Sequence, residues 1–442
     1  MDRIIIEGVR CFYERRSVLL KPITLLTGEN STGKTTFLAM VRLAWDACNG
    51  RVPVDFNEEP FILGPYDEVA SYRGGRAGSA RTFTIGTEIA TKGGKPGSPA
   101  RITAVFGKKE GQPALTSWSL VADDVHVKVS YGEADATPYL RISGSSGRGT
   151  AMRLPASMSE RPVPEIIGMV MFSTVGELTR RQGLQKRHGH PSLSSLRDLA
   201  KAGREMLRLR AGFFQTLGSR PHAFAPIRSR PHRTYDPMRG IVDPEGSHVP
   251  SILVGLAALR PAAWNRFRPS LRSFGEASGL FSDLKVLRMG KKESGPFQIQ
   301  VKISGPAFNL MDVGYGVSQV LPIVVDSLRG EKGSTFLLQQ PEVHLHPKAQ
   351  AELGSFLAFL AKEHRKRFLI ETHSDYLVDR IRMEVRGGKV LKPEDVSLLY
   401  FERADGDVRI HSLEIDRMGN IVNAPKGYRQ FFLEEEKRLL GG

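Results

Sequence analysis

The stretch GENSTGKT, from Gly28 to Thr35, constrains the fold of this chain more than any other. It fits the pattern G-x-x-x-x-G-K-[ST] without a mismatch. An apolar run, PITLLT, precedes it, and TTFLAMVRLAWDAC, which has apolar residues at helical spacing, follows it. Glycines let the backbone curl around phosphate oxygens, while successive N–H groups and the helix dipole point at the anion. The sequence therefore predicts a strand, a phosphate-binding turn and a helix, as in an α/β protein.

The length and composition place the chain among ordinary globular proteins. Its 442 residues suffice for two or three structural units with a sizeable core. Cys11 and Cys48 are the only cysteines, which excludes a disulfide framework and fits a reducing cytoplasm. No apolar run is long enough to cross a bilayer, and the N-terminal apolar run is too short for a signal peptide. A cytoplasmic protein without a membrane partner is expected.

Positive charge is concentrated in the middle of the chain. The formal net charge is +16, and fourteen Lys and Arg residues lie between Arg180 and Arg239, opposed only by Asp198, Glu205 and Asp236. Such a segment attracts phosphates or an acidic partner, so contact with DNA or RNA through residues 180–240 is one interpretation. A solvated basic face without a ligand is the other, because no aromatic-rich stacking pattern accompanies the charge.

Strand and helix patterns divide the chain into three parts. Residues 83–145 alternate β-forming runs with turn residues, which predicts an antiparallel β subdomain. Residues 165–285 are mostly helical in pattern, the clearest helix being 195–218. We therefore expect an N-terminal lobe at 1–160 with the phosphate loop and the β subdomain. A basic helical insertion or lid at 161–290 and a C-terminal lobe at 291–442 complete the expected division.

A second motif, FLLQQPEVHLHP at 336–347, has the form of the strand that supplies an acid to the magnesium shell in P-loop enzymes. Gln339 stands where that acid is expected, and a carboxamide has no charge to hold a hydrated divalent cation. Two further motifs flank it in the chain, DVGYGVSQVLP at 312–322 and ETHSD at 371–375.

Taken in the order in which they occur along the chain, the four motifs resemble the ABC-type ATPase heads of the OLD/RecF/SMC-like group. The likeness is strongest to the small standalone AAA-family ATPases of two-component antiphage defence systems, and it extends over nearly the whole chain. The resemblance implies an α/β fold with a mixed P-loop sheet, an antiparallel β subdomain and a helical insertion. It also implies ATP and Mg²⁺ as cofactors, ATPase activity, and a dimer or higher oligomer that sandwiches ATP.

The resemblance also assigns roles to individual residues. A nucleotide-binding role falls on Arg10, Asn30, Ser31, Thr32, Gly33, Lys34, Thr35, Thr36, Gly316 and Ser318. Catalytic roles fall on Lys34, Ser318, Gln339, Gln340 and the switch histidine His373, and metal-binding roles on Thr35 and Gln339. Gly316 and Ser318 belong to the signature turn, which is expected to contact a nucleotide held by another subunit. His344 and His346 fall in the loop expected to cross the dimer.

Gln339 leaves two explanations open. The chain has either lost the acid naturally and binds ATP without efficient turnover, or a glutamate has been replaced by Gln339 to trap ATP. In both cases the hypothesis is that the chain hydrolyses ATP slowly and that Gln339→Glu restores the activity.

Two classes of function compete. An ATP-driven sensor would control a partner effector, such as a nuclease or toxin, in antiphage defence. A RecF- or SMC-like ATPase of DNA repair or chromosome maintenance would bind DNA. The signature wording VGYGVSQ and the large insertion disfavour a transporter motor. A nuclease domain is not expected in this chain.

Overall fold

The computed structural model describes most of the chain in two compact units. It covers residues 1–49, 53–89, 99–154, 219–236, 242–290, 295–404 and 407–428, with gaps at 73, 76–77, 123–124, 133–137 and 145–148 and isolated positions from 157 to 169 and from 430 to 438. Unit 1 comprises Met1–Leu20, Thr36–Arg220 and Arg403–Arg409, and unit 2 comprises Lys21–Thr35, Pro221–Glu402 and Ile410–Gly442.

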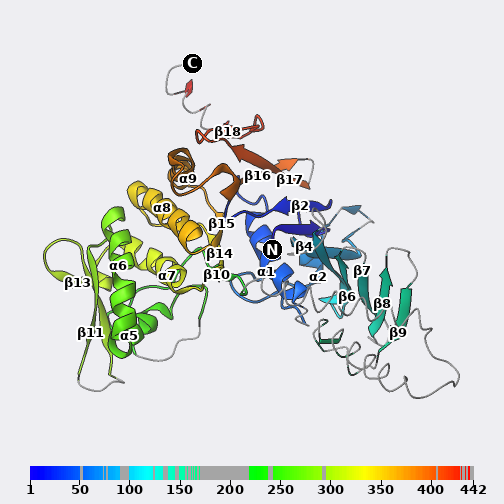
Figure 1. Cartoon of the computed structure of the whole chain (residues 1–442), viewed down its shortest axis with the longest axis horizontal. Helices are drawn as coiled ribbons and strands as arrows, with labels where there is room; N and C mark the ends of the chain where they lie inside the picture. Colours follow the sequence, from blue (N-terminus) through cyan, green and yellow to red (C-terminus); the bar gives the residue numbers. More distant parts are fainter. Residues whose placement is uncertain are drawn as a thin grey trace. The chain divides into compact units, whose positions relative to one another are not determined.

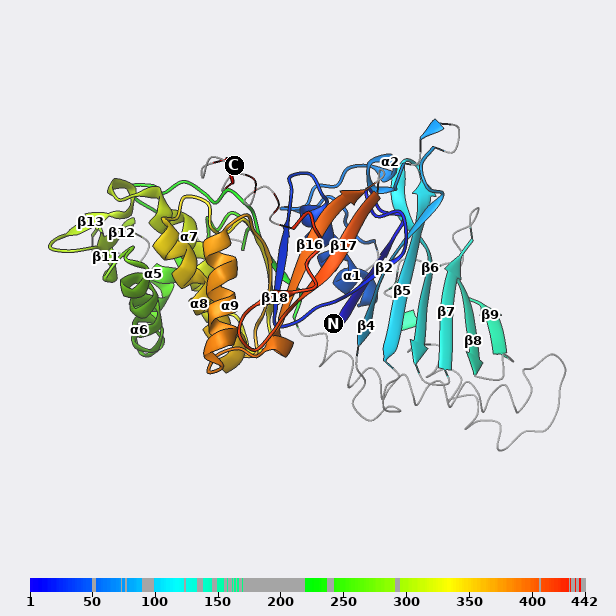
Figure 2. The same cartoon turned by 90° about the horizontal axis from the view of Figure 1, so that it is seen from above.

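Unit 1 is built on an eight-stranded sheet with the order β2-β1-β4-β5-β6-β7-β8-β9. Its neighbouring strands all pair antiparallel, which confirms the predicted antiparallel β subdomain. Strands β4 to β8 lie side by side in Figure 2. The strand bounds are Arg3–Glu7 (β1), Arg16–Leu19 (β2), Thr82–Ile89 (β4), Ala100–Lys109 (β5), Gln112–Ala122 (β6), Val125–Tyr131 (β7), Pro138–Gly144 (β8) and Gly149–Arg153 (β9).

Two helices accompany this sheet in the sequence. The long helix α1 (Lys34–Cys48) starts with two residues grouped with unit 2 and continues in unit 1, and α2 (Tyr66–Val69) is a single turn. In unit 1, the indole Nε1 of Trp118 on β6 donates to the carbonyl of Ala47 at 3.0 Å, which ties α1 to the sheet.

Unit 2 is built on a seven-stranded sheet with the order β10-β14-β15-β3-β16-β17-β18. Strands β10, β14, β15, β3 and β16 run parallel, so the carboxyl ends of β3, β14 and β15 share one edge. The bounds are Ile23–Gly28 (β3), His222–Phe224 (β10), Thr335–Gln339 (β14), Arg367–Glu371 (β15), Val396–Ala404 (β16), Asp407–Ile415 (β17) and Ile421–Val422 (β18). Parallel and antiparallel pairs together make a mixed sheet, and the predicted α/β class is confirmed.

Among the described residues of unit 2, five helices and a small sheet accompany the seven-stranded sheet (Figure 1). The helices are α5 (Val249–Leu259), α6 (Pro261–Ser278), α7 (Tyr315–Arg329), α8 (Pro347–Glu363) and α9 (Asp375–Gly387). The antiparallel sheet contains β11 (Asp283–Arg288), β12 (Phe297–Lys302) and β13 (Ala307–Asn309). Short 3₁₀ turns, η3 (Leu310–Asp312) and η4 (Pro393–Asp395), precede α7 and β16.

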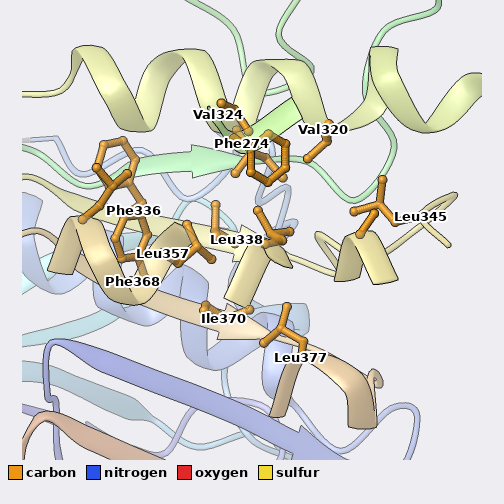
Figure 3. Packing of buried hydrophobic residues seen from close by; sticks show 14 of the residues in the cluster. Phe274, Val320, Val324, Phe336, Leu338, Leu345, Leu357, Phe368, Ile370 and Leu377 are labelled. Carbon is orange, nitrogen blue, oxygen red and sulfur yellow. The ribbon is translucent and has the colours of Figure 1, made fainter. Parts of the chain in front are cut away.

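The core of unit 2 lies between the parallel strands and these helices (Figure 3). Phe336 of β14 stacks on Phe368 of β15, with ring centroids 5.2 Å apart and planes 15° apart. Val320 and Val324 of α7 and Leu357 of α8 belong to the same buried cluster. Each such side chain contributes about 1.5–3 kcal/mol through burial, so the strands that carry the motifs are held in place by this buried cluster.

Several predictions concern parts of the chain that the structure does not describe. The helix predicted at 195–218 and most of the basic segment 180–240 lie outside the described residues. The division at 160 and 290 stays a prediction, and the two compact units have different boundaries. Among the described residues, no helix has the length and apolarity to span a membrane.

Candidate nucleotide-binding site

The loop between β3 and α1 has the backbone conformation that a phosphate cradle requires. Gly28 has φ 134° and Gly33 has φ 83°, in the left-handed half of conformational space that favours glycine. A Cβ at Gly28 would lie 2.4 Å from the carbonyl oxygen of Phe401 on β16, so no side chain fits there. Ser31 also has a positive φ of 60°. The motif thus folds as the strand, curled turn and helix that the sequence predicted.

Lys34 lies over this turn with its ammonium group turned back toward the loop. The side chain is buried, and Nζ donates to the carbonyl oxygens of Gly28 at 3.0 Å and Glu29 at 2.5 Å. Burial lowers the pKa of Lys34, while the carboxylates of Glu371 and Glu29 oppose that shift. The ammonium group therefore lies against the backbone of the loop, and its contact with terminal phosphates stays a prediction.

The other predicted loop residues divide into exposed and buried side chains. Asn30, Ser31 and Thr35 are exposed, whereas Thr32 is buried and donates from its hydroxyl to the carbonyl of Glu29 at 2.8 Å. The exposed side chains are accessible to a ligand. Thr32 stabilises the shape of the turn.

Thr35 contacts an acid that the sequence motifs did not single out. Its hydroxyl lies 3.0 Å from Oε1 and 2.8 Å from Oε2 of Glu371, at the carboxyl end of β15. Glu371 is 5% exposed. Burial raises its pKa, while the hydroxyl of Thr35 and the charge of Lys34 oppose that shift. The acid next to the loop hydroxyl thus comes from β15.

Gln339, predicted to occupy the magnesium shell, makes a different contact. Its amide Nε2 donates to the carbonyl oxygen of Phe224 on β10 at 3.2 Å. Gln340 has φ 41°, and its backbone N–H donates to the carbonyl of Glu371 at 2.8 Å. Neither amide contacts Thr35 in the hydrogen bonds of the described residues. Metal-binding and catalytic roles for these two residues stay predictions.

Glu342 and His373 meet at the same edge of the sheet. The backbone N–H of His373 donates to Oε1 of Glu342 at 2.8 Å, while Oε2 is buried without a hydrogen-bond partner among the described residues. Burial raises the pKa of Glu342. Partial burial and the nearby Lys34 lower the pKa of His373, which favours its neutral imidazole. A second buried carboxyl group therefore lies close to Glu371, whose pKa it raises.

The signature residues begin helix α7, beside the turn that contains His344. Gly316 is packed so closely that a Cβ would lie 2.8 Å from the carbonyl oxygen of His344. The Ser318 hydroxyl donates to the carbonyl of Tyr315 at 2.8 Å, and the Tyr315 ring lies 5.5 Å from the ring of His344. The two motifs that the resemblance assigns to the dimer contact are thus neighbours in unit 2, where Tyr315 and His344 are exposed while Gly316 and Ser318 are buried.

Arg10 is held in unit 1 by backbone carbonyls. Nε donates to Glu68 O at 3.1 Å and Nη2 to Leu63 O at 2.9 Å, while Nη1 lies 3.4 Å from the hydroxyl of Thr36. Thr36 directly follows Thr35 in the sequence. Burial lowers the pKa of Arg10. Its predicted contact with nucleotide remains a prediction.

Arg228, in the described part of the basic segment, is buried. Its guanidinium donates to backbone carbonyls of α7, of its own loop and of the segment after β14. Burial lowers its pKa to about 10, with Glu342 opposing the shift. Its acceptors are Gln319 O (2.9 Å), Pro226 O (2.8 Å), Ala225 O (3.2 Å), Pro341 O (3.3 Å) and Gln339 O (3.5 Å). Arg228 therefore links the signature helix to the end of β14.

Two other arginines in the described part of the basic segment, Arg220 and Arg233, pair with acids. In unit 1, Arg220 donates to both Asp46 and Glu58 at 2.6–2.8 Å. In unit 2, Arg233 pairs with Asp312, and both side chains are exposed. Contact with nucleic acid stays a prediction that falls mainly on residues outside the described ones.

Comparisons with known proteins agree with the motifs. Residues 257–378 match the family model of the AAA ATPase domain, and residues 391–440 match a family described only as a protein of unknown function (DUF3696). DNA repair protein RAD50 of Dictyostelium discoideum is 23% identical over 173 residues, which are 38% of this chain. The matched region spans only 11% of the length of that relative.

Solved structures of SMC heads are similar over nearly the whole chain, although at low identity. An Smc head domain derived from Pyrococcus furiosus, bound to the C-terminal domain of ScpA, is 10% identical with a TM-score of 0.42 and covers 99% of both chains. The SMC head domain from Thermotoga maritima is 11% identical with a TM-score of 0.37 and covers 94% of this chain and 99% of the other. The chain resembles the SMC/RecF/OLD-like ABC-type ATPases.

The site of this SMC/RecF/OLD-like chain fits ATP and magnesium in the chemistry of its donors. The loop offers backbone N–H groups and Lys34 for phosphate oxygens. The hydroxyl of Thr35 and the carboxylate of Glu371 are oxygen ligands of the kind that Mg²⁺ prefers, and Oε2 of Glu342 is a further buried oxygen for which the described part of the chain supplies no hydrogen bond. A magnesium ion, when bound, would neutralise charge on the phosphates.

Sequence reasoning did not single out Glu371, and it counted Arg228 in the basic segment without predicting that it is buried. Glu371 could have been found, because it is an acid at the end of an apolar strand directly before the switch histidine. No comparable signal predicts the burial of Arg228. Its loop contains three prolines within APIRSRPHRTYDP and has the composition of an exposed basic segment, whereas Arg228 is only 2% exposed.

Proposed function

We propose that this chain binds ATP with Mg²⁺ in the loop from Gly28 to Thr35 and closes on a second copy of itself. The closed state would control a partner effector, a nuclease or toxin, in cytoplasmic defence against phage. The observation that carries the nucleotide site is one strand, turn and helix with Lys34 over the turn and the pair Thr35–Glu371 beside it. An effector as partner follows from the motif resemblance described above.

The start of α7 supports closure between two copies. Its N-cap, Gly314, has no side chain to cap the first turn, and the N–H of Val317 donates to the carbonyl of Gly314 at 3.2 Å, so the N–H groups that precede Val317 are the ones this end offers to an acceptor. Helix N-termini attract phosphate through these groups and the helix dipole. Gly316 and Ser318 lie in this turn. A second copy would thus complete the phosphate site with groups that a single chain leaves available.

The test measures self-association with and without ATP by light scattering after gel filtration. Lys34→Ala is expected to abolish nucleotide binding and association together. Ser318→Arg is expected to keep binding of a fluorescent ATP analogue but to lose association, because a long side chain blocks the phosphate face of α7. Ser304→Arg, in the exposed turn between β12 and β13, is the matched control and should associate like the wild type. Association that ignores ATP in all four proteins contradicts the proposal.

Hydrolysis is proposed to be slow because the two residues at the end of β14, Gln339 and Gln340, have carboxamide side chains and neither is an acid. Gln339→Glu restores a carboxylate there and is expected to raise phosphate release by up to about 100-fold, the lower range for a positioned acid or base. Steady-state phosphate release measures this, with ATP binding as the check on folding. Equal rates for the two proteins would remove Gln339 from the explanation.

A DNA-maintenance ATPase is the second candidate, favoured by the similarity to a DNA repair protein and by the net charge of +16. Binding through several phosphates makes affinity fall steeply with salt, since counterions are released. Titration of duplex DNA at 50 and 200 mM salt separates the candidates. A loss of about 10³-fold or more indicates a DNA-binding ATPase, whereas no binding at 50 mM salt favours a protein partner.

A further inference from the structure

We propose that Glu371, on β15, is the acid that holds the magnesium ion of bound ATP in this chain. The second-motif strand β14 offers only Gln339 at the corresponding position. This inference rests on the proposed function, because it concerns the metal that accompanies the nucleotide. It assigns to the ETHSD segment a role beyond that of its histidine.

Strand order brings Glu371 closer to the loop than Gln339. The three strands lie in the order β14-β15-β3. In the sheet, Gln339 of β14 is the partner of Glu371 of β15, and Glu371 is in turn the partner of Leu26 of β3. Neighbouring strands lie about 4.8 Å apart, so a side chain on β15 starts one strand nearer to β3, which leads into the turn. A carboxylate lost from β14 can therefore be replaced from β15 without any change in the sheet.

The side chains of Glu371 and Gln339 point in the directions that this strand order favours. Both carboxylate oxygens of Glu371 lie 2.8–3.0 Å from the hydroxyl of Thr35, whereas the amide of Gln339 donates to Phe224 O on the opposite neighbouring strand, β10. Magnesium binds six oxygens at about 2.0–2.1 Å in an octahedron, which places adjacent ligand oxygens about 2.9 Å apart. The Thr35 and Glu371 oxygens already have this separation.

A hydrogen bond has the same oxygen separation, so Glu371 could serve only to fix the first turn of α1. Charge and burial favour the metal role. Glu371 is 5% exposed and lies near a second buried carboxyl group, Glu342, whose Oε2 has no partner among the described residues. The Nζ of Lys34 donates to the loop carbonyls of Gly28 and Glu29. Two neighbouring buried acids favour a divalent cation.

The test uses Glu371→Gln in the full chain and a fluorescent ATP analogue, titrated in Mg²⁺ and in EDTA. In the wild type, Mg²⁺ is expected to tighten binding. In Glu371→Gln, binding in Mg²⁺ should weaken by about 10- to 100-fold, the range for losing a group that supports a metal site. Binding in EDTA should stay equal or become tighter, because the variant removes a negative charge next to the phosphates. Binding in EDTA also reports that the loop is folded.

Glu352→Gln is the matched control, since it removes the same charge from α8, where Glu352 pairs with Arg380 at 2.7 Å. It should keep the Mg²⁺ dependence of the wild type. Electron paramagnetic resonance of Mn²⁺, titrated into chain saturated with ADP, gives a second readout. Weaker Mn²⁺ binding in Glu371→Gln alone is expected.

The outcomes separate this inference from the proposed function. If the wild type binds no nucleotide in either buffer, the proposed function fails. If the wild type and Glu371→Gln bind nucleotide with equal Mg²⁺ dependence and equal Mn²⁺ affinity, the site is intact and only the role of Glu371 is refuted.

Discussion

Replacing Arg228 with Met tests whether a buried cation holds the signature helix to the second motif. The substitution keeps a long apolar side chain but removes every donor. The two shortest bonds of Arg228, to Gln319 O on α7 and Pro226 O, are 2.9 and 2.8 Å long. A further bond reaches Pro341 O, just beyond β14, at 3.3 Å. Loss of these bonds should loosen the start of α7 and the end of β14 together.

The size of the effect follows from two opposing contributions. Hydrogen bonds from a charged group are worth about 1.5–3 kcal/mol each, so the two short ones contribute about 3–6 kcal/mol. Burying the guanidinium offsets part of this. The pKa of Arg228 falls from 12.5 to about 10, and each unit corresponds to about 1.4 kcal/mol, or about 3 kcal/mol in all. With buried carbonyls left without a donor, Arg228→Met should cost about 2 kcal/mol of local stability.

Hydrogen exchange measured by mass spectrometry gives the local readout. A loss of about 2 kcal/mol corresponds to about 30-fold faster exchange where protection depends on this unit. Peptides covering 315–329 and 336–346 should show it, whereas β4 to β6 of unit 1 serve as the internal reference. Arg233→Met, in the same loop but exposed and paired with Asp312, should leave these rates unchanged. Rates in Arg228→Met within twofold of the wild type would refute the reasoning.

Two further predictions concern unit 2. Gly316→Ala should lose about 1–2 kcal/mol in urea unfolding, because its Cβ would meet the carbonyl of His344 at 2.8 Å and overpacking outweighs the helix preference of alanine. A Cβ at Gly255 in α5 would have no atom within 4 Å, so Gly255→Ala should raise the free energy of unfolding by up to about 1 kcal/mol. Equal losses of stability in the two variants would contradict this reasoning. Burial lowers the pKa of Lys366 to about 8. Between pH 8 and about 10.4, Lys366 is therefore protonated in the unfolded chain but mostly neutral in the folded chain. Because the unfolded chain binds more protons in this range, the free energy of unfolding rises with pH. Compared with Lys366→Met, the wild type should gain on the order of 1 kcal/mol between pH 7.5 and 9.5, and a constant difference would rule out the shift.

Much of the fold could be predicted because its signals are local. The apolar runs that became β3, β14 and β15, and the glycine pattern at Gly28 and Gly33, depend on neighbours within a few residues. The antiparallel strands of unit 1 could be predicted for the same reason, since each pairs with the next along the chain from β4 to β9. Local periodicity and turn chemistry determine such elements.

The site could be predicted only in part, because its contacts join distant segments. Gln339 was recognised from its motif, but the direction of its amide depends on β10, a strand of three residues more than 100 positions earlier. The importance of Glu371 depends on β15 lying between β14 and β3, which no single segment encodes. Arg228 is buried because α7 and the end of β14 surround a loop whose composition is that of a surface.

The position of β3 in its sheet has a consequence for how the protein is made. Ile23 pairs with Phe368 on one side and Val396 on the other, so the partners of this strand are synthesised about 345 residues after it. At about 5–20 residues per second, an apolar strand emerges from the ribosome roughly 20–70 s before either partner exists. Until then its edges are open to other chains, and protection by a chaperone during translation should govern how much protein reaches the native state.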